Sequence, residues 1–420
     1  TLFPAAAVET AQTIGRLCFA PKVALWFAEQ ASARAAYCKL LLAQLAATAS
    51  CGVLLILVTK QLLQGHGNAV LSLFLVVAGV LSAVEAGIKV VLVSVVSKVW
   101  PSGFSAGERE LANANSKVTI CDLIAAAATP VAISSVLAPL GYAATAVSLV
   151  LWQLAASAGM MGVSLALGGR LASLESGASP DGKQTGPASP RPRPCQQRAP
   201  LSLRCVLTEW LGLPRHVRGA MLGMVLLYCT VLCERITPWL RMQGVSVASI
   251  AAWRASMQLV AFLGAAAAPL VVRRFGLLRT ARIGQAWQMC LVLAAVVAFL
   301  TSSMLSLLTA IAVSRVGLWW YDLSLRQMIQ GAAPEHVLAP LFATEGSAQQ
   351  CAQLVMLLLI SLVFPRPGEF AGPVLVSAAA AVAAGAVLNV GARLRPEDAS
   401  LELSTLTTKQ GVDSATLLRS

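Results

Sequence analysis

A small number of ionisable residues lie inside long apolar stretches of the sequence. Glu85, Asp122 and Asp322 each occupy such a stretch. A charge is costly in hydrocarbon, so an ionisable side chain within a membrane span is a candidate functional residue by default. These three carboxylates are therefore candidates for the pathway of a transported ion.

A pair of cysteines forms a second candidate site. Cys229 and Cys233 are four residues apart, which would put both thiols on one face of a helix, and Glu234 follows directly. Thiolate and carboxylate ligands together suit Fe²⁺, Co²⁺ or Zn²⁺. The alternative is that the two cysteines only fill space between helices.

Several basic residues are spaced so that their side chains could neutralise these carboxylates. Arg326 follows Asp322, and Lys89 follows Glu85, by four residues, so each pair can meet on one helix face. Arg315 lies two helical turns before Asp322 on the same face. Each pair is either structural or part of a gate lining the pathway.

Two interpretations are also open for Asp122. It either pairs with Lys117 or Arg109 at the end of a helix, where it would hold a gate, or contacts the cation directly.

The composition indicates which elements must position these residues. The chain has 420 residues, of which 57% are hydrophobic and only 12% charged, and its mean hydropathy is +0.74. Soluble domains carry about 25% charged residues, and disordered chains are polar. We therefore predict an all-α, polytopic membrane protein, without a role in nucleic-acid binding.

Apolar runs of membrane-spanning length recur along the whole chain. We expect about eleven spans, the first interrupted by Glu9, Arg16 and Lys22. They lie near 2–28, 37–58, 68–97, 118–139, 141–168, 217–240, 246–272, 280–301, 304–331, 338–364 and 371–393.

The segment between the fifth and sixth runs differs in composition. Residues 169–216 are rich in Gly, Ser, Pro and Arg, which favours a flexible cytoplasmic linker. The linker divides the chain into a first lobe (1–168) and a second lobe (217–393), and a polar tail (394–420) follows.

Positive charge is concentrated in alternate loops. It follows the first, third, fifth, seventh and eleventh runs, and Arg326 lies near the end of the ninth, whereas the other loops are poor in charge apart from Arg235 and Arg241. The positive-inside rule then puts the linker and the tail in the cytoplasm and Thr1 on the opposite side. Since carriers of this kind commonly have six plus six spans, we expect an incomplete first lobe with five. Two helical lobes joined by a basic linker predict a major facilitator-like fold with a central site.

Several motifs resemble the ferroportin (solute carrier family 40) family. The segment from Gly107 through Leu111-Ala112-Asn113-Ala114-Asn115 to Asp122 and Pro130 is similar to that family's signature, and residues 314–323 (SRVGLWWYDL) look like its tenth helix. Residues 227–232 with 243–245, and 273–280, resemble further family segments in the same order. The opening Leu2-Phe3-Pro4 aligns with the family's second helix.

The resemblance implies an exporter of ferrous iron or a related divalent metal such as cobalt, working by alternating access in the plasma membrane or an organellar envelope such as that of plastids. It implies no cofactor and no enzymatic activity, and we expect a monomer whose partners are the metal ion and the lipid bilayer. The family's first-helix metal ligands and last-helix histidine have no counterpart, and Cys233-Glu234-Arg235 departs from its Asp-Cys pair. A carrier of a small organic or metal-chelate solute, and an inactive truncated membrane scaffold, therefore remain as alternatives.

Overall fold

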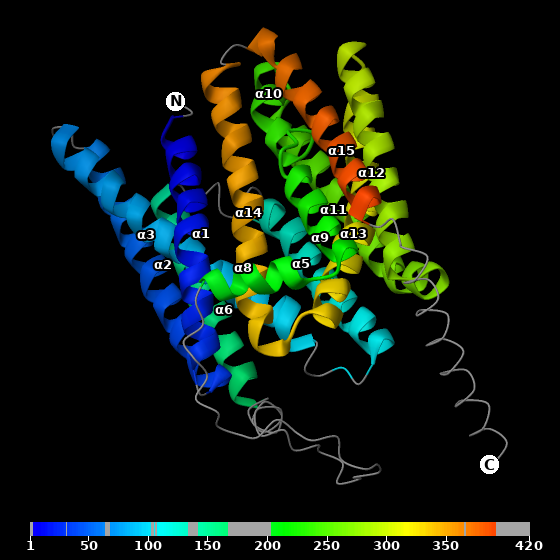
Figure 1. Ribbon diagram of the computed structural model, residues 1–420. Coiled ribbons are helices and arrows are strands. Elements are labelled where there is room, and N and C mark those ends of the chain that lie inside the picture. The colour runs from blue at the N-terminus through cyan, green and yellow to red at the C-terminus, as the bar shows by residue number, and fades with distance from the viewer. Residues whose placement is uncertain are drawn as a thin grey trace.

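Long helices make up nearly all of the described structure (Figure 1). The computed structural model describes residues 3–30, 32–63, 68–101, 105, 107–132, 142–166, 203–364 and 367–391. The first-lobe helices are α1 (Phe3–Glu29), α2 (Ala33–Leu63), α3 (Asn68–Ser94), the π-helical turn η1 (Val95–Val99), α5 (Glu108–Ala132) and α6 (Tyr142–Ala166). After them come α8 (Leu203–Gly212), α9 (Arg215–Leu227), the 3₁₀ turn η4 (Glu234–Ile236), α10 (Thr237–Met242), α11 (Val247–Phe275), α12 (Leu277–Leu300), α13 (Met304–Ala332), α14 (Glu335–Leu362), the 3₁₀ turn η5 (Pro367–Glu369) and α15 (Ala371–Gly391).

Most of the predicted membrane spans correspond to these helices. Six of them are long and apolar enough to cross a membrane by length and composition, within the described part of the chain. The apolar segments run over Ala35–Leu54, Val76–Val99, Val247–Phe275, Leu277–Leu300, Met304–Ala332 and Ala371–Gly391.

Two parts of the chain differ from the sequence-based expectation. The predicted span 217–240 is not one helix, because α9 ends at Leu227 and α10 begins only at Thr237. The predicted linker 169–216 lies outside the described residues up to residue 202, and its last part forms the short helix α8. The polar tail from 394 onward also lies outside the described residues.

The most extensive contacts between the two lobes lie along two pairs of described helices. Within the first lobe α3 packs against α1 and α2, and α2 packs against α6. Within the second lobe α13 packs against α11 and α12, and α15 packs against α9 and α12. Between the lobes α1 lies along α14, and α5 lies along α11, as Figure 1 also shows for α1 and α14.

Small residues line both contacts between the lobes. Ala339 and Ala343 of α14 are buried in the core of the first lobe, while Ala261 and Ala265 of α11 are buried with Leu123 of α5. Side chains of this size let helices approach closely, which is a common basis of packing in membranes.

A glycine contact fixes how α12 crosses α13. A Cβ atom at Gly317 would collide with the carbonyl oxygen of Gly284 and would lie 2.8 Å from the Cδ1 atom of Trp287. Beside this crossing, the Tyr321 hydroxyl donates a hydrogen bond to the Ala220 carbonyl at 2.6 Å, which ties α13 to α9. The crossing therefore sets which face of α13 points toward the rest of the second lobe.

Gly317→Ala is expected to destabilise the protein by about 1–3 kcal/mol, because the new methyl group would overpack a contact with backbone. Thermal unfolding of the detergent-purified chain measures the change. Gly331→Ala in the same helix is the matched control, since nothing lies within 4 Å of a Cβ atom there. Equal unfolding temperatures for the two variants would contradict the role of the crossing.

Candidate functional site

The break between α9 and α10 exposes backbone in the middle of the second lobe. The helix ends at Leu227, and Tyr228–Cys233 lead irregularly to the 3₁₀ turn η4. Pro238 lies in the first turn of α10, where its missing N–H group is tolerated. Irregular backbone at membrane depth needs partners other than water, so each exposed N–H and C=O group must be accounted for.

Arg235 supplies hydrogen bonds to two backbone carbonyl oxygens of this segment. Its Nη1 atom donates to the carbonyl oxygens of Tyr228 and Thr230, both at 2.9 Å. Ser377 of α15 accepts a hydrogen bond from the Val231 N–H at 2.9 Å. The break is thus held by one guanidinium group and by a hydroxyl from a neighbouring helix.

A cavity of about 640 Å³ opens beside the break. Its polar lining comes from the break with its continuation into η4 and α10, and from helices α11, α12, α13 and α14. The lining residues with polar or aromatic side chains are Tyr228, Thr230, Cys233, Arg235, Thr237, Arg254, Gln288, Arg315, Trp319, Asp322, Arg326 and Gln353.

One face of α13 supplies most of the charge in the cavity. Arg315, Trp319, Asp322 and Arg326 all line it, and their spacing follows successive helical turns. The Nη2 atom of Arg326 lies 2.5 Å from the Oδ2 atom of Asp322, and both side chains are largely buried. The Arg326 guanidinium also lies over the ring of Trp319, 5.9 Å from its centroid.

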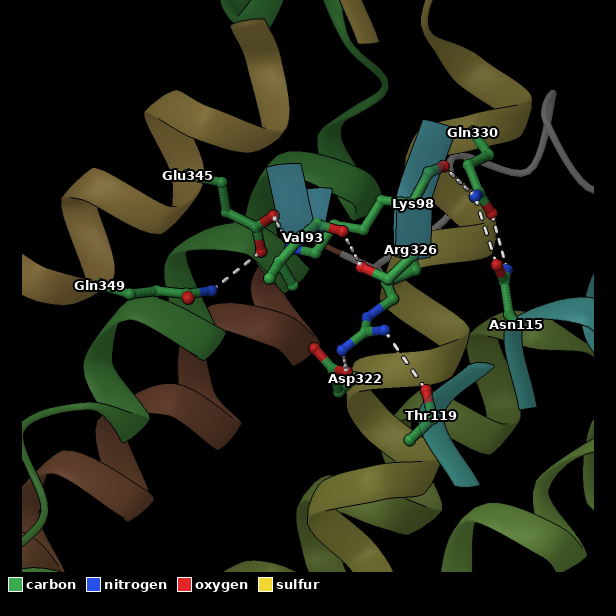
Figure 2. A network of polar contacts seen from close by, with 10 residues as sticks. Val93, Lys98, Asn115, Thr119, Asp322, Arg326, Gln330, Glu345 and Gln349 are labelled. Carbon is green, nitrogen blue, oxygen red and sulfur yellow. Dashed lines mark hydrogen bonds and ion pairs between the residues drawn. The ribbon is translucent and has the colours of Figure 1, made fainter. Parts of the chain in front are cut away.

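A polar network joins the lobes at one end of this cavity. Figure 2 shows the Arg326 guanidinium reaching Asp322 of its own helix and Thr119 of α5, to whose Oγ1 atom Nη1 donates at 3.4 Å. One helical turn further along α13, the Gln330 amide accepts a hydrogen bond from Asn115 Nδ2 at 2.8 Å and donates to the Lys98 carbonyl at 2.5 Å.

A buried ion pair completes this inter-lobe network. Lys98 Nζ lies 3.6 Å from Glu345 Oε2, and the Glu345 side chain is only 3% exposed. The ammonium also lies 4.8 Å from the ring centroid of Phe342, and Gln349 donates to the second Glu345 oxygen at 3.1 Å. The members of the inter-lobe network are Lys98, Asn115, Thr119, Arg326, Gln330 and Glu345. All lie toward the helix ends that the loop charges predict to be cytoplasmic.

Four of the predicted residues come together in the second lobe. Cys233, Asp322, Arg315 and Arg326 line the same cavity. The expectation that Cys229 and Cys233 share a helix face is wrong, because the helix ends before both; Cys229 instead donates to the Ala352 carbonyl at 3.8 Å. Glu234 begins the turn η4.

The other predicted residues lie away from the cavity lining. Glu85 accepts a hydrogen bond from Gln44 Nε2 at 3.4 Å, and Lys89 is exposed and, among the described residues, forms no ion pair with Glu85. Asp122 and Lys117 are exposed on α5, and within the described part of the chain Asp122 forms no ion pair with Lys117 or Arg109.

Sequence reasoning missed Glu345, Gln288 and the role of Arg235. The one signal for Arg235 was its position, as a positive charge in a loop that is otherwise poor in charge. Glu345 is a carboxylate inside the predicted span 338–364, so the rule that selected Glu85, Asp122 and Asp322 could also have found it. Nothing in the local sequence distinguishes Gln288 from other polar residues in these helices. Among the described residues, no group of three or more His, Cys, Asp or Glu side chains is placed to hold a metal ion.

Comparison with known proteins identifies similar chains. The sequence profile of the family described as Ferroportin1 (FPN1) matches residues 1–381. A search of curated protein sequences finds no match.

Solved structures with the same fold include transporters. The crystal structure of a bacterial homologue of the iron transporter ferroportin, in an outward-facing state with soaked iron, has a TM-score of 0.74 at 20% identity, over 94% of this chain and 91% of that chain. An inward-facing structure of a bacterial homologue has a TM-score of 0.59 at 21% identity, over 94% and 90%. The E. coli fucose:proton symporter has a TM-score of 0.57 at 14% identity, over 93% and 92%. The predicted major facilitator-like fold, in an all-helical, multi-pass membrane protein, is confirmed.

Arg235→Gln is expected to lower the free energy of unfolding by about 1.5–3 kcal/mol, because the variant loses two charge-assisted hydrogen bonds to the broken backbone. Thermal unfolding in detergent is the measurement. Arg241→Gln is the control, since Arg241 donates only one exposed hydrogen bond, to the Val245 carbonyl. Equal stability of the Arg235→Gln variant and the wild type would contradict the capping role.

Proposed function

Because the chain belongs to the ferroportin family, we propose that it carries a divalent metal ion, Fe²⁺ or a related ion such as Co²⁺, across a membrane by alternating access. The observation that carries the proposal is the pairing of a polar cavity in the second lobe with an inter-lobe network that closes one end.

The location of the network supports the alternating-access part of the proposal. Its bonds run between η1 or α5 of the first lobe and α13 or α14 of the second, so they form only when these helices approach. Rocking of the lobes would break them and open the end that the loop charges predict to be cytoplasmic. Lys98 lies in a π-helical turn, a feature that often marks a functional position in a helix.

The similarity to other structures agrees with this conformation. The chain is more similar to the outward-facing state of the bacterial ferroportin homologue than to the inward-facing state. A closed cytoplasmic end with a cavity toward the opposite side is the arrangement expected for an outward-facing carrier.

Two cavity residues supply ligand types that suit a divalent transition metal. Asp322 provides a carboxylate and Cys233 a thiol, and both line the cavity. Asp322 is already paired with Arg326, so metal binding would have to draw this carboxylate away from the guanidinium. Such competition would link binding of the metal to the inter-lobe network, because Arg326 also bonds Thr119 of the first lobe.

Purified protein reconstituted in vesicles should move Fe²⁺ or Co²⁺ above the rate of empty vesicles, and Asp322→Asn should reduce this flux at least about tenfold. Flux of the metal into or out of the vesicles is the measurement. Glu85→Gln is the matched control, because Glu85 lies outside the cavity and bonds Gln44.

A double variant tests whether Asp322 is a metal ligand or only the counter-ion of Arg326. If Asp322 only neutralises Arg326, Asp322→Asn combined with Arg326→Gln should restore flux; if Asp322 binds the metal, flux should stay low. Absence of metal flux in the wild type would reject the proposal and favour an inactive membrane scaffold.

Glu345→Gln should weaken the closed cytoplasmic end, because one charge-assisted contact is lost. The equilibrium between the outward-open and the inward-open state should then shift about tenfold toward the inward-open state. In a chain whose only cysteine is Cys233, a membrane-impermeant thiol reagent applied from the side opposite the linker should label the variant more slowly. Glu85→Gln again is the control, as it affects a contact within the first lobe. Unchanged labelling of the Glu345→Gln variant would show that the Lys98–Glu345 pair does not hold the closed state.

A further inference from the structure

The cavity in the second lobe carries an excess of positive charge. Among the described residues, four guanidinium groups line it, and Asp322 is the one carboxylate. The four are Arg235, Arg254, Arg315 and Arg326. Guanidinium groups among apolar helices are costly unless something pairs with them, so the partners of each must be identified.

Three of the four arginines are occupied. Arg235 binds the carbonyl oxygens of the broken helix, Arg326 binds Asp322 and Thr119, and Arg254 has an interaction of its own. Arg315 is different. It is half-buried and has neither a hydrogen bond nor an ion pair with any residue in the described part of the chain.

A second unpartnered group faces the same cavity. Gln288 of α12 lines the cavity and is only 3% exposed, yet its amide oxygen has no hydrogen-bond partner among the described residues. Burying an amide without a partner costs free energy. No hydrogen bond to the amide nitrogen is present among the described residues either, and a half-turn of the amide plane exchanges its oxygen and nitrogen. Gln288 can therefore present its N–H groups to a ligand that accepts hydrogen bonds.

The helix crossing brings these two groups to the same region. Gly284 contacts Gly317 where α12 crosses α13; Gln288 follows Gly284 by one turn, and Arg315 precedes Gly317 by two residues. Arg315 and Gln288 therefore flank one contact, and both line the same cavity of about 640 Å³.

We propose that this cavity binds a small organic anion through a carboxylate group, held by the Arg315 guanidinium and the Gln288 amide. A planar guanidinium matches a carboxylate with two parallel N–H···O bonds, and an amide N–H can donate a further one. The indole of Trp319 on the same face of α13 offers an apolar surface for the carbon skeleton. The volume is that of a small-molecule site and far exceeds what a bare metal ion needs.

Citrate is a suitable probe, because its several carboxylates match a lining with several guanidinium groups. Isothermal titration of the detergent-purified full chain in metal-depleted buffer should give saturable binding with a Kd of about 1 mM or tighter. Arg315→Gln should weaken binding about 10- to 100-fold. Arg315→Lys should give an intermediate loss, because the charge stays and the bidentate fork is lost.

Two further measurements exclude an indirect effect. Arg279→Gln, which removes an exposed arginine from the start of α12 outside the cavity, should bind citrate like the wild type. Without ligand, Arg315→Gln should unfold at the same temperature as the wild type or higher, because it removes a guanidinium that has no partner among the described residues. A lower unfolding temperature would indicate a structural arginine and overturn the assignment.

Three binding results would also overturn the proposal: no saturable citrate binding, equal citrate binding by the Arg315→Gln variant, or inorganic phosphate binding as tightly as citrate. Since these titrations contain no metal, they succeed or fail independently of metal flux in vesicles.

Discussion

The second lobe depends on one constraint: backbone that leaves helical geometry inside a membrane protein must find partners within the protein. Arg235 meets this demand for two carbonyl oxygens, and Ser377 meets it for one N–H group. Because these backbone groups have hydrogen-bond partners, α9 can end in the middle of the predicted span 217–240. The chain then continues through an irregular segment into α10. That break provides one wall of the cavity, and α13 provides the charged wall facing it.

Arginines that look equivalent in the sequence have different roles in the structure. Arg235 stabilises backbone, and Arg326 joins a carboxylate of its own helix to Thr119 of the other lobe. Arg315 lines the cavity without a partner in the part of the chain that the structure describes. The cavity and the inter-lobe network share Arg326. Events in the cavity are thus physically connected to the contact between the lobes, which is what a carrier requires of its binding site.

Two pairs of residues with the same spacing show how far local reasoning reaches. Asp322 and Arg326, four residues apart, form an ion pair, whereas Glu85 and Lys89, also four apart, do not among the described residues. Spacing brings the side chains of such a pair to one helix face, but neighbouring helices decide which partner is used. Gln44 of α2 donates a hydrogen bond to the Glu85 carboxylate instead.

The sequence by itself determined the class of the protein, the positions of most spans and the family, because apolar length and motif order are local properties of the chain. It also indicated Asp322, Arg315, Arg326 and Cys233 as candidate residues, since ionisable and thiol groups in apolar runs are conspicuous. Only the tertiary structure decided that the run 217–240 is broken, because its apolar composition is continuous and its partners, such as Ser377, lie far along the chain. Likewise, the Lys98–Glu345 pair joins residues almost 250 positions apart, and no local pattern encodes such a contact.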